Sequence, residues 1–185
     1  RRSSDLGGKK RIEDYYQPAD VVLGNAQGFI EANKDKSFFL YLTHYAVHLP
    51  IQAKADITAK YKKKKPGGGH NNPAYAAMVE SMDDSIGAVQ ATLKRLKLDD
   101  NTIVIFFADN GGHAAVTSNA PLRGSKGMLY EGGIREPLAI KWPGVTKPGS
   151  TCHEPVIAVD FYPTLLKAGG VQPDPKQKLD GVSIL

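Results

Sequence analysis

The chain has 185 residues, of which 41% are hydrophobic and 23% charged, a composition typical of a soluble globular domain with a packed core. No apolar run approaches the roughly 20 residues that a membrane-spanning helix needs. The start, "RRSSDLGGKKRIEDYY", is polar and basic, so it does not have the character of a signal peptide. It also lacks a methionine, and we expect it to be an internal stretch of a longer protein.

The excess of positive charge is concentrated in one run of lysines. The formal net charge is +5, and Lys62–Lys65 supply most of it. Because "PGGGHNN" follows this run, residues 60–72 are predicted to form a mobile, solvated loop. No aromatic residues are interleaved with the lysines, so nucleic-acid binding is not expected, whereas a polyanion-binding surface stays open as an alternative.

Two elements are predicted in the first quarter of the chain. Residues 1–18 are poor in apolar side chains and are expected to be irregular. Residues 20–36 are predicted to form a helix because four apolar residues fall on one helical face, namely Val22, Ala26, Phe29 and Ile30. The short, aromatic-rich run "SFFLYLT" (37–43) then predicts a buried strand.

A long helix is the clearest prediction. Asn72 suits its N-cap and Pro73 its first turn. An apolar stripe then continues through about six turns, formed by Tyr75, Val79, Met82, Ile86, Val89, Leu93 and Leu96. Asp83 and Asp84 lie beside this stripe, and we expect both to be solvated.

Two further apolar runs, "TIVIFFA" (102–108) and "PLAIKW" (137–142), are predicted to be strands. A strand, a long helix and a second strand in succession favour a right-handed crossover between parallel strands. Residues 156–170 predict a helix with Asp160 as its cap and Gly169-Gly170 as its stop. The predicted fold class is therefore α/β, with a mostly parallel sheet flanked by helices.

Polar side chains follow two of the predicted strands, at the strand ends where open α/β sheets bind ligands. His44 and His48 follow the first strand, and Asp109 and Asn110 follow the second. A carboxylate and an amide oxygen together suit a hard cation such as Ca²⁺ or Mg²⁺. The same dipeptide also forms Asx turns that merely end a strand, so both interpretations stay open on these residues alone.

The glycine-rich segment 110–136 is long and irregular, as functional loops often are. Lys126 lies among glycines that allow an anion to approach closely, and His48 has the chemistry of an acid, a base or an anion-contacting donor. Each could equally be a plain surface side chain. In the same segment, Arg123 and Arg135 could bind an oxyanion through two hydrogen bonds each. Alternatively, Glu131, Arg135 and Glu136 could pair with one another.

Four segments together resemble the sulfatase family of the alkaline-phosphatase superfamily, and bacterial-type arylsulfatases in particular. They are "FIEANKDKSFFLYLTHYAVHLPIQA", "YAAMVESMDDSIGAVQATLKRLKLDDNTIVIFFADNGG", "NAPLRGSKGMLYEGGIREPLAIKWPG" and "VIAVDFYPTLLKAGG" with "LDGVSIL". They occur in family order over roughly residues 14–185. The resemblance implies an alkaline-phosphatase-like (sulfatase) fold, here incomplete, with residues 1–185 forming one partial catalytic domain.

The resemblance also carries roles to particular positions. Asp109 and Asn110 match the pair that ligates the divalent cation, usually Ca²⁺, with Mg²⁺ as the other possibility. His48 matches the histidine that contacts the sulfate ester and assists departure of the leaving group. Lys126 matches the lysine that contacts the sulfate group.

The sequence departs from the family where the nucleophile is concerned. Sulfatases convert the cysteine of an N-terminal Cys-x-Pro/Ala-Ser-Arg motif to formylglycine, and Cys152, the one cysteine here, has no such context. We expect Cys152 to be a small, partly buried residue and the formylglycine to lie in a missing N-terminal part. The family's early pair of metal-binding aspartates has no match either, and the chain alone is expected to be inactive.

The expected function is that of a fragment of a sulfuric ester hydrolase acting on an aryl or carbohydrate sulfate, periplasmic or secreted by resemblance. Two alternatives are a phosphodiesterase or phosphonate hydrolase of the same superfamily and a non-catalytic polyanion-binding module that uses Lys62–Lys65. His44 and His113 lie near the predicted site, and no role is assigned to either.

Overall fold

The computed structural model describes residues 19–185, and the irregular structure expected for residues 1–18 lies outside the described residues. The chain divides into two compact units, Arg1–Pro143 and Gly144–Leu185. Among the described residues, no helix combines the length and the apolar character needed to cross a membrane.

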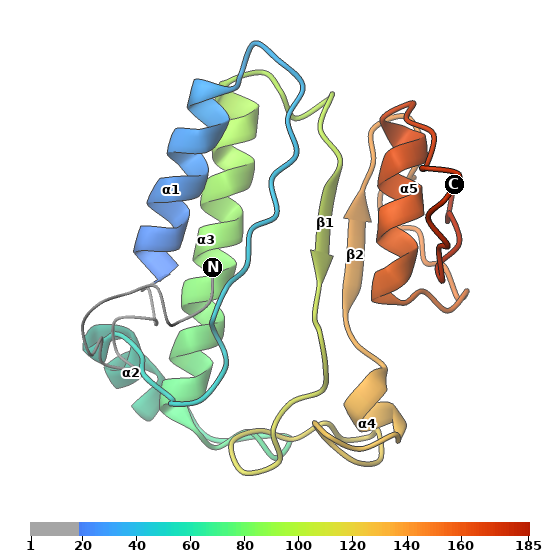
Figure 1. Cartoon of the computed structure of the whole chain (residues 1–185). Coiled ribbons are helices and arrows are strands. Elements are labelled where there is room, and N and C mark those ends of the chain that lie inside the picture. The colour runs from blue at the N-terminus through green and yellow to red at the C-terminus, as the bar shows by residue number, and fades with distance from the viewer. Residues whose placement is uncertain (1–18) are drawn as a thin grey trace, which may run out of the picture. The chain divides into compact units, whose positions relative to one another are not determined.

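Two packed helices, α1 (Ala19–Ala32) and α3 (Pro73–Arg95), make up much of the first unit (Figure 1). Ala26 and Ile30 of α1 are only 2% and 1% exposed, which confirms the predicted apolar face. Phe29, at the edge of that face, is 37% exposed and packs edge-on against the ring of Phe38.

Helix α3 begins as predicted, because the Asn72 side chain accepts hydrogen bonds from the backbone N–H groups of Ala74 and Tyr75. Its buried face is centred on smaller residues than predicted, namely Ala77, Met78, Ser85, Thr92 and Leu93. Val79 of the predicted stripe is 40% exposed. Small side chains allow a neighbouring helix to approach closely, and Gln27 of α1 reaches Thr92 on this face at 2.9 Å.

The short helix α2 (Ala55–Lys62) packs against α3. The prediction of a loop from residue 60 is therefore wrong for Lys60–Lys62, which are helical. An ion pair of 2.6 Å between Lys60 Nζ and Glu80 Oε2 of α3 contributes to the contact between the two helices. Beyond α2 the chain turns back on itself, with a bridge between Gly67 and His70.

The sheet has two strands, β1 (Val104–Phe107) and β2 (Leu138–Lys141), both within the predicted ranges. They run antiparallel, with Val104 opposite Lys141 and Phe107 opposite Leu138 (Figure 1). The mostly parallel sheet is therefore not confirmed. The segment between the strands contains only the short helix α4 (Glu131–Ile134), and it returns the chain beside β1 in the opposite direction.

The strand predicted at residues 37–43 is wrong for this structure, because these residues have no regular secondary structure and pair with neither β1 nor β2. A strand is stabilised by its ladder, and residues 19–185 offer this apolar run no partner. Two of its aromatic side chains consequently face solvent, since Phe39 is 69% and Tyr41 is 80% exposed.

The second unit contains the helix α5 (Phe161–Ala168), preceded by a 3₁₀ turn, η3 (Ala158–Asp160). Asp160 is the N-cap residue of α5, as predicted, although its side chain makes no capping hydrogen bond to this helix. Its backbone already has helical dihedral angles, and its carboxylate accepts from the N–H groups of Ile157 and Val182 at 3.0 and 2.9 Å. These bonds lower the pKa of Asp160.

Two smaller expectations fall in the same unit. Gly169 is the C-cap of α5, as predicted. Cys152 is exposed, so the expectation of a partly buried cysteine is wrong.

Candidate functional site

Asp109 and Asn110 lie immediately beyond the end of β1. The last ladder hydrogen bond runs from the N–H of Ala108 to the carbonyl of Pro137 at 3.3 Å. Asp109 is exposed and Asn110 is half-buried. The structure therefore places both predicted ligands at a strand end, where a bound ion could reach them.

Gly111, which follows Asn110, is packed against α4 too closely for a side chain. A Cβ on Gly111 would overlap the carbonyl oxygen of Gly132, and a Cβ on Gly133 would overlap that of Met128. The N–H of Gly111 donates to the carbonyl of Gly133 at 3.2 Å. Because glycine alone permits such close backbone approach, Gly111, Gly132 and Gly133 allow the loop after β1 to pack against α4.

Lys126 is brought to the same loop through its backbone. Its N–H donates to the carbonyl of Gly112 at 3.2 Å. The Asn119 amide also holds Gly112, accepting from its N–H and donating to its carbonyl at 2.9 Å each. The side chain of Lys126 is exposed. Three of the four predicted site residues, Asp109, Asn110 and Lys126, thus belong to adjoining loops.

The described hydrogen bonds of His48 stay within its own loop. Its Nδ1 lies 2.8 Å from the carbonyl oxygen of Leu49 and 2.7 Å from the hydroxyl of Tyr45, whose proton is donated to the same Leu49 carbonyl. The carbonyl oxygen of Leu49 and the hydroxyl oxygen of Tyr45 therefore both accept from Nδ1, so Nδ1 carries the proton. In the neutral ring, Nε2 then carries the lone pair that is available to a substrate.

We expect Tyr45→Phe to weaken the preference of His48 for the tautomer protonated at Nδ1. The change removes one of the two acceptors of Nδ1–H, and a hydrogen bond of about 1 kcal/mol corresponds to roughly a fivefold shift toward the Nε2–H form. Ring ¹⁵N chemical shifts of His48 measure the ratio directly. Tyr41→Phe, at an exposed tyrosine, is the control; equal ratios in all three proteins would contradict the assignment.

His44 and His113, to which no role was assigned, have local partners. His44 Nε2 hydrogen-bonds the buried Ser85 hydroxyl of α3 at 2.9 Å, and burial lowers the pKa of His44. His113 is exposed and accepts from the N–H of Ala115 through Nδ1. His44 therefore attaches the segment after residue 43 to α3.

The structure distinguishes between the alternatives left open for the charged residues of the loop. Arg135 pairs with Glu131 one helical turn away, at 3.4 Å. The Arg123 guanidinium lies over the ring of Tyr130, 3.9 Å from its centroid, in a cation–π arrangement. Both arginines thus have partners within the loop, and we include neither among the candidate site residues.

Glu136 is a residue that the sequence interpretation did not place at the site. It is half-buried, and its Oε1 is the one buried side-chain polar atom within residues 19–185 that lacks a hydrogen-bond partner. Burial and the nearby Asp109 carboxylate raise the pKa of Glu136. In the sequence, Glu136 could have been noticed only because it directly precedes the predicted strand 137–142. If that strand ran parallel to the strand 102–108, as predicted, Glu136 would lie at the opposite end of the sheet from Asp109.

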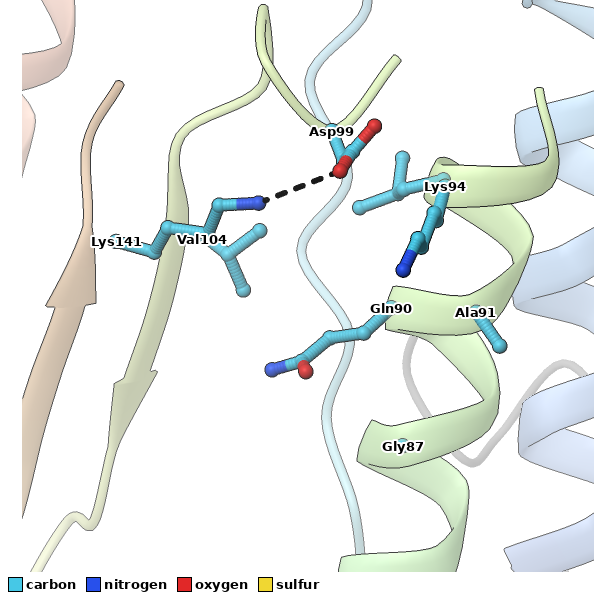
Figure 2. A pocket seen from close by; sticks show the side chains of 8 residues that line it. Gly87, Gln90, Ala91, Lys94, Asp99, Val104 and Lys141 are labelled. Atoms are coloured by element: carbon cyan, nitrogen blue, oxygen red, sulfur yellow. Dashed lines mark ion pairs between the residues drawn. The ribbon is translucent and has the colours of Figure 1, made fainter. Parts of the chain in front are cut away.

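A cavity of about 270 Å³ lies elsewhere, between α3 and the sheet (Figure 2). Its lining includes Gly87 and Lys94 of α3 and Val104 of β1, and an ion pair of 4.0 Å joins Lys141 to Asp99 there. None of the predicted site residues contributes to it. Within residues 19–185, no group of three or more His, Cys, Asp or Glu side chains is arranged to hold a metal.

Comparison with known proteins connects this loop arrangement to one family. A family model described as Sulfatase matches residues 3–171. A sulfatase of Formosa agariphila is 43% identical over 177 residues, which cover 89% of this chain and 32% of the relative. Arylsulfatase J of Mus musculus is 40% identical over 150 residues, covering 80% of this chain and 25% of the relative. The chain thus spans about a third or less of these relatives.

Solved structures agree with the sequence relatives. The crystal structure of Ps i-CgsB in complex with k-i-k-neocarrahexaose has a TM-score of 0.82 and 34% identity, covering 90% of this chain and 37% of that one. The structure of Ps i-CgsB alone has a TM-score of 0.84 and 32% identity, covering 98% and 43%. By the extent of the family match and these structural neighbours, the chain belongs to the sulfatase family.

Proposed function

We propose that this chain carries part of the active site of a sulfuric ester hydrolase, with the formylglycine nucleophile supplied by residues outside the chain. The observation that carries the proposal is the bond from the N–H of Lys126 to the carbonyl of Gly112, which holds the lysine beside the Asp109-Asn110 loop. In a member of the sulfatase family, this arrangement supports binding of a cation and of a sulfate ester at one place.

The residues present fit a hard divalent cation, Ca²⁺ or Mg²⁺. Asp109 and Asn110 offer oxygen ligands at an accessible strand end. The orphaned carboxylate oxygen of Glu136 adds buried negative charge close to Asp109. Ca²⁺ takes six or more oxygen ligands, so we propose that the others come from outside this chain.

Each residue has a definite task in sulfate ester cleavage. The reaction leaves negative charge on the sulfuryl oxygens and on the departing alcohol oxygen. A bound divalent cation would stabilise the charge on the sulfuryl oxygens as a Lewis acid. Lys126 would donate to the same oxygens, and the free Nε2 of His48, when protonated, would donate a proton to the leaving oxygen.

The substrate is proposed to be an aryl or carbohydrate sulfate. The oligosaccharide bound to the related Ps i-CgsB supports the carbohydrate class. By family resemblance we also propose a periplasmic or secreted location. Because the nucleophile is placed outside the chain, purified residues 1–185 are expected to hydrolyse no aryl sulfate, and measurable turnover free of contaminating enzyme would contradict this.

Calcium titration tests the cation site directly. We expect the chain to bind Ca²⁺ weakly, with a dissociation constant of roughly a millimolar, because only part of the ligand shell is present. Asp109→Asn should weaken binding at least about tenfold by calorimetry, since it removes a charged ligand. Asp83→Asn, at an exposed aspartate of α3, is the matched control. Equal binding by wild type and Asp109→Asn would refute the site.

A polyanion-binding role is the second candidate, and one observation favours it. Within residues 19–185, Lys62, Lys63 and Lys65 are exposed and form no ion pair. Lys60 and Lys64 lie over the ring of Tyr61, which leaves this aromatic ring poorly placed to stack on a nucleobase. Salt-sensitive binding of a sulfated glycan that survives Asp109→Asn and Lys126→Ala would favour this role over the enzyme site. The phosphodiesterase or phosphonate hydrolase alternative differs in its nucleophile, which we likewise propose to lie outside this chain.

A further inference from the structure

Three lysines at the end of α2 carry positive charge that the fold does not neutralise. Lys62, Lys63 and Lys65 are exposed, and in the part of the chain that the structure describes they form no ion pair. We call these three residues the lysine patch. They follow one another along the chain, so their ammonium groups repel at ranges comparable with the roughly 10 Å over which salt screens charge. A bound polyanion would relieve this repulsion.

A turn of glycines follows the lysine patch and fixes its position. The N–H of His70 donates to the carbonyl of Gly67 at 2.9 Å, which closes a β-turn. Gly68 and Gly69, at its centre, have φ angles of +60° and +81°, in the region that favours glycine. A residue extends the chain by at most about 3.6 Å, so Lys65 lies within roughly 7 Å of Gly67. The lysine patch therefore stands at the base of a defined turn.

This turn packs against the loop that follows β1, at the end of the first unit where α2 and α4 also lie (Figure 1). Nδ1 of His70 and the hydroxyl oxygen of Thr117 are 3.1 Å apart in a hydrogen bond. Thr117 also packs against Gly112, since a Cβ on Gly112 would lie 2.5 Å from the Thr117 Cγ2. The carbonyl of Gly112 accepts from the N–H of Lys126. A single residue, Thr117, thus joins the turn to the loop that holds Lys126.

We propose that the lysine patch is a second anion-binding site beside the candidate active site, and that the substrate is a carbohydrate chain with several sulfate groups. One group would be held at Lys126 and another at the patch. This inference rests on the proposed function, because it takes Lys126 as the contact for the sulfate that is cleaved. A chain that contacts both places binds more tightly than one that contacts either alone, since the second contact is made within the complex.

The chemistry of the patch favours a carbohydrate over a nucleic acid. Lysine ammonium groups on flexible stems bind sulfates as point charges, without requiring a planar arrangement of the anion. A nucleic acid would also need an aromatic face on which its bases stack. Tyr61, the aromatic residue beside the patch, has Lys60 and Lys64 over its ring, with Nζ 5.4 and 4.8 Å from the centroid. The patch therefore offers charge without a stacking surface.

Replacing the lysine patch by glutamine in the 185-residue chain tests the inference. The probe is dextran sulfate on a sensor surface, with unmodified dextran as the blank, and surface plasmon resonance measures the dissociation constant at physiological ionic strength. We expect the triple change to raise this constant at least about fivefold, because three exposed charge contacts are lost. The matched control should leave it unchanged, since it removes the same charge from three exposed lysines of the second unit, Lys147, Lys176 and Lys178.

Two further variants separate the position of the patch from its charge and from the stability of α2. Gly69→Ala keeps every charge, but its Cβ would lie 2.8 Å from that of Ser118, so the turn could no longer pack as it does. We expect it to raise the dissociation constant at least about threefold. Gly67→Ala, with nothing within 4 Å of the added Cβ, should have no effect. Lys63→Gln with Lys65→Gln, both beyond α2, should raise the constant without altering the helix.

The outcomes separate this inference from the proposed function. An unchanged constant for the triple change or for Gly69→Ala, an equal rise in the control, or equally tight binding of polyglutamate or single-stranded DNA would overturn the inference. We expect Lys126→Ala to weaken dextran sulfate binding as well. If it does not, the patch acts without the site, which overturns the inference and favours the polyanion-binding role. The proposed function fails on a different measurement, calcium titration of Asp109→Asn, which involves none of these lysines.

Discussion

Replacing Gly111 with alanine is expected to disrupt the candidate site severely, although the change adds only one methyl group. The added Cβ would overlap the carbonyl oxygen of Gly132 and lie within 2.9 Å of the Gly133 Cα. These are backbone atoms of a buried turn, so they cannot yield as a flexible side chain would. We expect a loss of about 3 kcal/mol or more in the free energy of unfolding, together with loss of calcium binding. Chemical denaturation and calcium titration measure the two effects.

Gly87→Ala provides a control of opposite sign. Gly87 lies within α3, and nothing stands within 4 Å of the position that its Cβ would occupy. Alanine should therefore stabilise the helix by about 0.5–1 kcal/mol. If Gly111→Ala proved as harmless as this control, the close packing of the loop against α4 would not be a requirement of the site.

In a full-length sulfatase that contains this chain, Lys126→Ala is expected to lower kcat by about 10²–10³-fold. The reason is that a positioned donor at a developing negative charge contributes this much in comparable sites. Because the backbone of Lys126 is bonded to Gly112, the substitution removes the ammonium group and leaves the loop in place. Steady-state kinetics with an aryl sulfate measures the change, and Lys126→Arg should restore part of the activity.

Lys36→Ala is the matched control for charge, since Lys36 is an exposed lysine remote in sequence from the glycine-rich loop. It should leave kcat unchanged. A fall in kcat of less than threefold for Lys126→Ala, or an equal fall for the control, would mean that the lysine does not contact the reacting sulfate.

The candidate site could be predicted in part because its residues carry signals in their own neighbourhoods. Asp109 and Asn110 follow an apolar run, and Lys126 lies among glycines. Glu136 has no such signal, because its place depends on which strand lies beside β1 and in which direction. His48 was singled out as a candidate, but its tautomer depends on Tyr45 and Leu49, whose orientations are set by the folded loop.

The sequence by itself determined that α1, α3 and α5 form, since a helix is stabilised by contacts among near neighbours, whereas α2 and α4 were not predicted. The cap at Asn72, the buried face of α1 and the stop at Gly169 all follow from local side-chain chemistry. The ranges of β1 and β2 were predicted on the same basis, from runs of apolar residues.

Only the tertiary structure decided how those strands pair, because a ladder joins residues far apart in the chain and the apolar pattern does not encode its direction. The run 37–43 has the composition of a strand, yet it forms none among the described residues because no partner lies beside it. The antiparallel pairing of β1 and β2 likewise brings Glu136, just before β2, near Asp109, just after β1. Asp109 and Asn110 could be singled out as candidate ligands from the sequence, whereas the nearness of Glu136 to Asp109 depends on the long-range pairing of the strands.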